Sequence, residues 1–150
     1  MYLLSPRPPQ RELGVFFNVD SSVGHMGSNS NRTDILLVQF LIRKLSVIAA
    51  ANLSPNQVAR MGRVSVDGMS GPITIDGIRA VQEKMREKYP RTVVDGRVSS
   101  ARPAGNYGGG IWTIVTLNTS VRSRIPSVWP RLQDVPDCPP TLKLEFQKCM

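Results

Sequence analysis

The sequence contains few of the side chains that metal, redox or nucleophilic chemistry uses. Its 150 residues include one histidine, His25, and two cysteines, Cys138 and Cys149. A lone histidine with no ligand pattern around it argues against a zinc hydrolase and against a nucleophile activated by a base. The cysteine spacing fits no zinc or redox motif, so we expect free thiols, with a bridge in an oxidising setting as the alternative. We therefore expect no metal and no cofactor.

Long apolar runs are also missing. The longest strongly apolar stretch, residues 35–42, is far shorter than the ~20 residues that a transmembrane helix needs. The opening residues, MYLLSPRPPQ, have no basic stretch before their apolar residues and turn to proline at once, unlike a secretory signal. We expect no membrane span and no signal peptide, with synthesis in the bacterial cytoplasm and a final location in a virion or other extracellular assembly.

The sequence has fewer acidic than basic residues. It contains 11 Asp and Glu and 19 Lys and Arg, which gives a formal net charge of +8. This excess favours an anionic partner such as a wall polymer, nucleic acid or an acidic protein surface. The basic residues are spread in short clusters, however, which is more typical of a solvated surface than of a nucleic-acid-binding arm. Glu83 and Glu87 have the spacing of solvated helix charges rather than of a glycosidase pair. We therefore expect a protein without catalytic activity.

Helical periodicity dominates the middle of the chain. Apolar residues recur at steps of three and four over 34–49, 74–89 and 111–125, which predicts three helices, with Asn31 or Thr33 capping the first. Ser54 followed by proline predicts a short further helix over residues 55–61.

Turn residues prepare the start of the central helix. The stretch VDGMSGPITIDGIRAVQ, residues 66–82, places an Asp67-Gly68 turn and a Gly71-Pro72 pair before Thr74, which we predict to be the N-cap. A second VDG occurs at residues 94–96 and precedes a glycine-rich insertion. The same turn is therefore expected twice.

The two ends of the chain have a different character. Residues 1–13 are rich in proline and are predicted to be extended, and 14–19 form a β-prone run. Prolines interrupt 126–140, and the closing TLKLEF alternates apolar and polar residues, which predicts a strand. We expect this strand to pair with 14–19 or with the sheet of another protein. The arm residues expected to bind a partner are Phe16, Phe17, Leu142, Leu144 and Phe146.

The spacing of the central residues resembles that of a known family. The matching residues are Val38, Gln39, Asp67, Gly68, Gly71, Pro72, Thr74, Ala80, Val81, Gln82, Asp95, Gly96, Val98, Trp112 and Leu117. Over roughly residues 33–120 the chain resembles the peptidoglycan-binding-domain type 1 family. The resemblance implies a compact three-helix domain that typically targets wall enzymes to peptidoglycan and has no catalysis of its own.

Most of these residues have a structural explanation. Turn geometry accounts for both Asp-Gly pairs in preference to ligand contact. We expect Gln39 and Gln82 to bond loop backbone across the core, and Trp112 to fill the core, with sugar stacking as the alternative. The candidate surface for a ligand or partner consists of Met69, Ser70, Arg97, Asn106 and Tyr107.

Together these patterns predict a mainly α protein with three parts. These are an N-terminal arm over 1–30, a peptidoglycan-binding-like helical domain over 31–125 and a proline-rich arm over 126–150, with short strands in the arms. The preferred function is a non-catalytic accessory component of a larger assembly, such as a bacteriophage capsid or tail, docked to other subunits through its arms. The alternatives are a free-standing peptidoglycan-binding module and, less favoured, a basic nucleic-acid-binding protein.

Overall fold

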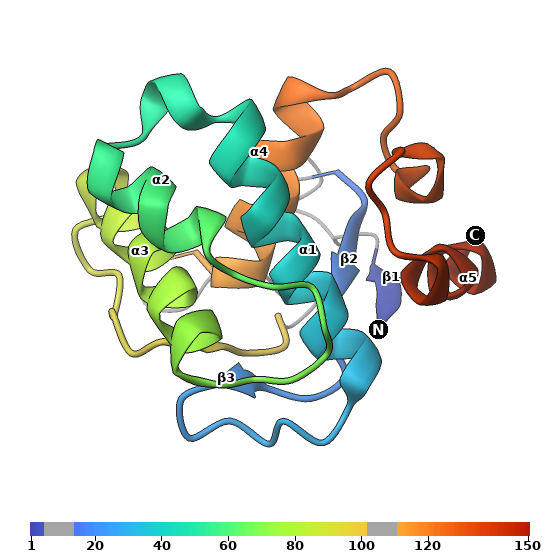
Figure 1. Cartoon of the computed structure of the whole chain (residues 1–150), viewed down its shortest axis with the longest axis horizontal. Helices are drawn as coiled ribbons and strands as arrows, with labels where there is room; N and C mark the ends of the chain where they lie inside the picture. Colours follow the sequence, from blue (N-terminus) through green and yellow to red (C-terminus); the bar gives the residue numbers. More distant parts are fainter. Residues whose placement is uncertain (5–13, 102–110) are drawn as a thin grey trace.

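Five α-helices form most of the computed structural model, which describes residues 1–4, 14–101 and 111–150 (Figure 1). In chain order the elements are β1 (Tyr2–Leu4), β2 (Phe16–Asn18), β3 (Val23–Gly24), α1 (Arg32–Ile48), the 3-10 helix η2 (Ala50–Asn52), α2 (Pro55–Gly62), α3 (Pro72–Lys88), β4 (Arg97–Val98), α4 (Thr113–Arg124), the 3-10 helix η3 (Leu132–Asp134) and α5 (Pro140–Cys149). The mainly α prediction is confirmed. None of the described helices has both the length and the apolar composition needed to cross a bilayer.

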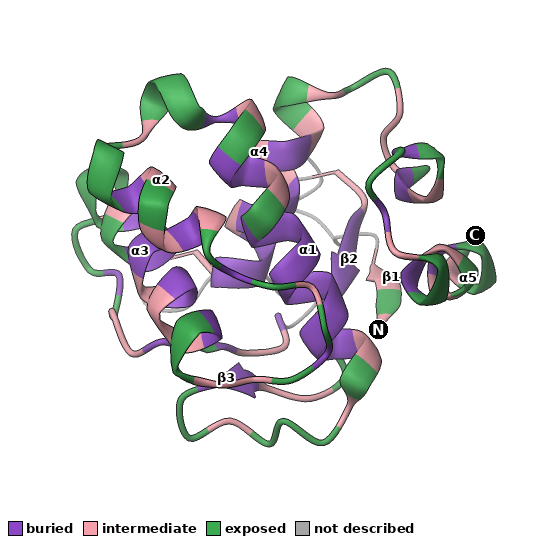
Figure 2. Cartoon of the chain, in the orientation of Figure 1, coloured by how far each residue is buried: buried purple, intermediate pink, exposed green. Residues whose placement is uncertain are grey.

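Helix α1 is the centre of the core, and α2, α3, α4 and α5 all contact it. Every residue of this helix from Asp34 to Ile42 is buried, and Figure 2 shows the buried stretch along its ribbon. The Asn31 side chain accepts hydrogen bonds from the backbone N–H groups of Thr33 and Asp34, which is the predicted cap. The helix is therefore held in place from its first turn by both capping and packing.

The starts of α2 and α3 differ in how far they follow the sequence prediction. Ser54 and Gln57 form a reciprocal capping box at α2, so the predicted short helix is confirmed. At α3 the N-cap is Gly71 and not Thr74, because Pro72 has a fixed φ suited to the first helical position and needs no N–H partner there. Thr74 lies in the first turn of α3 and is buried.

Two short antiparallel ladders join distant parts of the chain. Strand β1 pairs with β2, with Leu3 opposite Phe17, and β3 pairs with β4, with Gly24 opposite Arg97. Gly24 has a φ of 105°, and a Cβ there would lie 2.2 Å from the Gly96 carbonyl oxygen. The second ladder therefore needs glycine at this position, and it fixes the loop before α1 against the second Asp-Gly loop.

The predicted C-terminal strand is wrong, because residues 140–149 form helix α5. Pro140 occupies the first helical turn, and Leu142 and Phe146 are four residues apart, so they share one helical face. Both side chains are fully buried, whereas Leu144 is 59% exposed. An alternation this short fits a helix as well as a strand, and packing decides between them.

Both terminal segments pack into the same core as the central helices. The Phe146 ring contacts Phe17 from β2 and Phe40 from α1, at centroid distances of 4.7 and 6.2 Å. Beside α5, the Met1 amino nitrogen lies 2.8 Å from the buried Asp34 carboxylate. The prediction that Phe16, Phe17, Leu142 and Phe146 bind a partner is therefore wrong, because at most 2% of each is exposed.

Candidate functional site

The Gln39 side chain, on α1, organises the first Asp-Gly loop. Its Oε1 accepts hydrogen bonds from the backbone N–H groups of Asp67 and Gly68, at 3.1 and 2.8 Å. Its Nε2 donates to Asp67 Oδ1, to the Met69 carbonyl and to Thr74 Oγ1, at 3.0, 2.9 and 3.1 Å. One fully buried amide thus fixes the loop and the first turn of α3 together.

The Gln82 side chain, on α3, repeats this arrangement at the second loop. Its Oε1 accepts from the Gly96 N–H at 2.8 Å. Its Nε2 donates to Asp95 Oδ1, to the Arg97 carbonyl and to Thr113 Oγ1, at 2.9, 3.0 and 3.3 Å. The prediction that the two glutamines bond loop backbone across the core is confirmed.

The loops also match in backbone conformation. Gly68 and Gly96 have φ of 75° and 72°, in the left-handed region that favours glycine. In each loop the Asp carboxylate accepts the N–H of the residue two positions on, Met69 or Arg97. The Met69 bond, with the one from Gln39, lowers the pKa of Asp67 from its ordinary value. Both aspartates therefore have the structural role that the turn pattern predicted.

A shallow depression lies beside each loop. The first, of about 300 Å³, is lined by Ser65, Asp67, Met69, Ser70, Gly71, Pro72, Ile73 and Thr74. The second, of about 420 Å³, is lined by Gln82, Val93, Asp95, Arg97, Ser99, Trp112 and Thr113. The two linings contain residues at equivalent positions. Asp67, Met69, Ile73 and Thr74 in the first correspond to Asp95, Arg97, Trp112 and Thr113 in the second.

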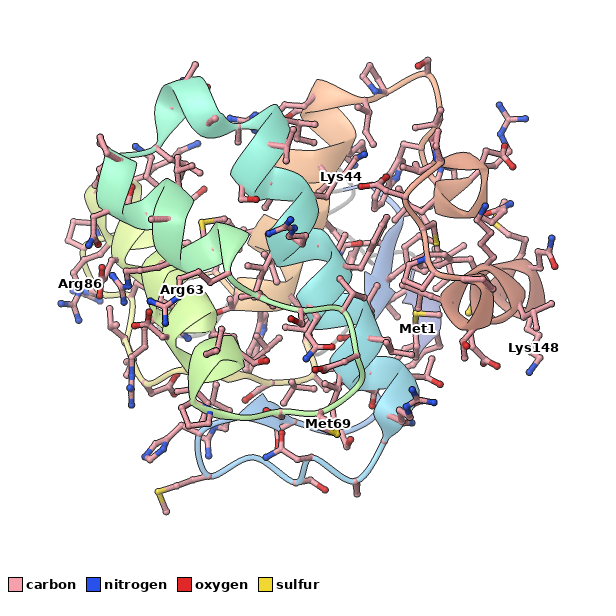
Figure 3. The ribbon with its side chains drawn as sticks, in the orientation of Figure 1. Met1, Lys44, Arg63, Met69, Arg86 and Lys148 are labelled. Atoms are coloured by element: carbon pink, nitrogen blue, oxygen red, sulfur yellow. The ribbon has the colours of Figure 1, made fainter. Side chains whose placement is uncertain are left out.

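The structure brings three of the predicted surface residues to these depressions. Met69 is 71% exposed on the loop that leads into α3 (Figure 3), and Arg97 is exposed in β4. The Ser70 Oγ is buried and makes no hydrogen bond within the described part of the chain. Asn106 and Tyr107 lie outside the described residues.

Trp112 was predicted to fill the core, and the structure leaves it only half-buried. It lies at the N-cap of α4, where one side of it packs against the core and it also lines the second depression. Thr113, which the sequence reasoning missed, is the counterpart of Thr74. Thr74 and Thr113 each follow a large apolar residue at the start of a helix, which is the one signal in the sequence that they are equivalent. The glycine-rich insertion makes the distance from the Asp-Gly pair to the Thr longer in the second loop than in the first.

Asn118 is a fully buried polar residue whose role the sequence did not indicate. Its Oδ1 accepts the Phe17 N–H at 2.7 Å, and its Nδ2 donates to the Phe17 carbonyl at 2.9 Å. These bonds fasten β2 to α4 in the interior. A single asparagine within an apolar stripe gave no indication of its partner strand.

Groups for catalysis do not gather at either loop. Among the described residues, no group of three or more His, Cys, Asp and Glu side chains could hold a metal ion. Cys138 and Cys149 are free, and burial raises the pKa of the Cys138 thiol to about 11, which keeps it protonated near neutral pH. Glu83 is bound by Arg60 at 2.6 Å.

The basic side chains labelled in Figure 3 are spread over the molecule. Figure 3 shows Arg86 and Lys148 at opposite ends of the molecule, with Lys44 between them. Lys44 and Lys148 are in addition bonded to carboxylates, those of Asp137 and Glu145.

A scan of the chain against protein-family models found no match, and neither a search of curated proteins nor a search of solved structures found one.

Proposed function

We propose that this protein is a non-catalytic binding module with a peptidoglycan-binding-like fold, and that its loop face binds peptidoglycan. The observation that carries the proposal is the pair of glutamine-anchored Asp-Gly loops, each bordering a depression. These loops are built from the residues on which the resemblance to the peptidoglycan-binding family rests. The function is thus assigned to a rigid surface and not to a reacting group.

The second depression has the chemistry that a wall fragment requires. Trp112 offers an aromatic ring for the C–H face of a sugar. Arg97 offers a guanidinium that pairs with a carboxylate, such as that of a lactyl group or a stem peptide. Gln82 bonds the Arg97 carbonyl and the side chain of Thr113, the residue after Trp112, so little loop ordering is needed on binding.

Co-sedimentation of the full chain with purified peptidoglycan tests this proposal. We expect Trp112→Ala and Arg97→Ala each to weaken binding by about tenfold, which corresponds to roughly 1.4 kcal/mol. Lys148→Ala, on α5, is the matched control and should bind as the parent does. Circular dichroism establishes that the variants are folded. Failure of the parent chain to sediment, or equal loss in the control, would reject the assignment.

A second candidate function is that of a component of a larger protein assembly such as a virion. The exposed apolar side chains beside the first loop favour it, since Met69 is 71% and Ile73 is 48% exposed. This surface is available to a partner subunit, whereas Phe16, Phe17 and Phe146 of the terminal segments lie in the core. Sedimentation velocity of the parent and of a Met69→Asp, Ile73→Asp variant tests for self-association. Self-association that the variant abolishes, without wall binding, would favour this candidate.

A further inference from the structure

An apolar groove of about 200 Å³ opens between α1, α2, α3 and α4, away from both loop depressions, and shares no lining residue with either. Its walls come mainly from Leu45, Ala49, Met61, Val81 and Met85, all of them buried residues of the core. For comparison, a dry engineered cavity of ~150 Å³ accepts benzene. The groove therefore has room for one aromatic ring or a short alkyl chain.

The rim of the groove is positively charged. Lys84, Lys88 and Arg124 line it, and no carboxylate does. Lys84 is paired with Glu87 at 2.6 Å. Lys88 lies 5.5 Å from the centre of the Tyr89 ring, and Arg124 donates hydrogen bonds to neutral groups of Asn52, Ser120 and Ser123. Lys88 and Arg124 thus carry positive charge at the mouth that these contacts do not neutralise.

A buried hydroxyl adds a polar group to the lining. Thr116, on α4, lines the groove, and its Oγ1 is buried without a hydrogen-bond partner in the described part of the chain. A hydroxyl in this state loses its hydration and gains nothing in exchange, so a ligand atom that bonds to it would recover the loss.

We propose that this groove binds a small amphiphilic carboxylate, whose ring or alkyl chain lies between Met61 and Met85 and whose anionic group lies at Lys88 and Arg124. Apolar walls with a few convergent polar groups are the usual composition of a small-molecule site. The rim charge selects acids over amines of the same shape. This site is independent of the wall-binding surface.

Methyl NMR on the full chain with labelled methionine tests the proposal. The Met61 and Met85 methyl groups report on the groove, and the exposed Met26 and Met69 serve as internal controls. The ligands are 3-phenylpropionate, the amine of equal length 3-phenylpropylamine, and an acidic peptide that contains one tryptophan. The variants are Lys88→Gln with Arg124→Gln, and Lys148→Gln as the matched control.

We expect 3-phenylpropionate to shift the Met61 and Met85 methyl signals saturably and to leave those of Met26 and Met69 unchanged. The amine should bind at least about tenfold more weakly, and the double variant should lose most of this preference, whereas Lys148→Gln should keep it. Equal binding of acid and amine would overturn the proposal, as would the absence of saturable shifts. Shifts caused by the peptide alone would also overturn it and would assign the groove to a protein partner.

Discussion

The two Asp-Gly loops have the same internal construction and different surfaces. In each, a buried glutamine amide bonds the glycine N–H, the carboxylate and the carbonyl two residues after the aspartate. The side chain at this last position is Met69 in one loop and Arg97 in the other. The residue before the bonded threonine is Ile73 in one and Trp112 in the other. The two loops thus share their buried hydrogen bonds and backbone conformation, while their exposed side chains differ.

This difference separates residues that hold the fold from residues that can recognise a ligand. Gln39 and Gln82 are almost completely buried and cannot meet a partner. Met69 and Arg97 are exposed, and their backbone is fixed by the glutamines. The first loop offers an apolar surface, and the second offers an aromatic ring and a guanidinium.

The largest effect is expected from removing the glutamine amides. Gln39→Ala abolishes five hydrogen bonds and Gln82→Ala abolishes four, and both leave buried loop groups unpaired. Each variant should lose about 3 kcal/mol of unfolding free energy in urea, with Gln39→Ala the more damaging. Gln147→Ala, exposed on α5, is the control and should change stability by less than about 0.5 kcal/mol. Equal stability of all three variants would refute the role of the amides.

The next effect comes from the loop glycines. A Cβ at Gly68 would meet the flexible Arg32 side chain, whereas one at Gly96 would lie 2.9 Å from the Ile75 Cγ2 methyl. Gly96→Ala should therefore cost about 2 kcal/mol and Gly68→Ala about 1 kcal/mol, measured by urea denaturation. Gly62→Ala, with no neighbour closer than 3.8 Å, is the control and should be close to neutral. A larger loss of stability in Gly68→Ala than in Gly96→Ala would contradict the packing described.

A smaller effect should appear in acid. The pKa of Asp67 is lowered by the Met69 N–H and the Gln39 amide, so the ionised form is favoured in the folded state. Its contribution is present above the unfolded pKa of about 3.9 and is lost as pH falls through the lower folded value. Asp67→Asn should therefore flatten the fall in stability below pH ~4. Thermal unfolding at several pH values measures this, and an unchanged slope would be the contrary result.

The smallest effect on stability is expected from exchanging the surface residues. A double variant with Met69→Arg and Arg97→Met should unfold within about 0.5 kcal/mol of the parent, because both side chains are exposed. Peptidoglycan binding should nevertheless fall, because the Arg97 guanidinium is no longer present in the second depression beside Trp112. Co-sedimentation and urea unfolding of the same samples separate the two effects. Loss of stability together with binding would mean that the surface and the interior are coupled.

Local signals predicted the parts of this arrangement that depend on few residues. The apolar stripe and the Asn31 cap gave α1, and the Ser54 signal gave α2. The Asp-Gly pairs predicted the two turns, and Gln39 and Gln82 were expected to bond the loop backbone. Each of these signals is complete within one helix or one turn.

The missed features depend on contacts between distant segments. The alternation of Leu142, Leu144 and Phe146 suited either period, and packing against Phe17 and Phe40 selected the helix. The ladder between β3 and β4 is too short to leave a pattern. The equivalence of Thr74 and Thr113 is hidden by the insertion before Trp112, so only the bonds to Gln39 and Gln82 reveal it.

The most direct test of the account is an NMR titration of the full chain with soluble peptidoglycan fragments. We expect saturable shifts at the Trp112 indole, the Arg97 side chain and the backbone amide of Gly96, with none at Lys148 or elsewhere on α5. Shifts confined to α5, or no saturable shift at the second loop, would contradict the claim that the glutamine-anchored loops present the binding surface.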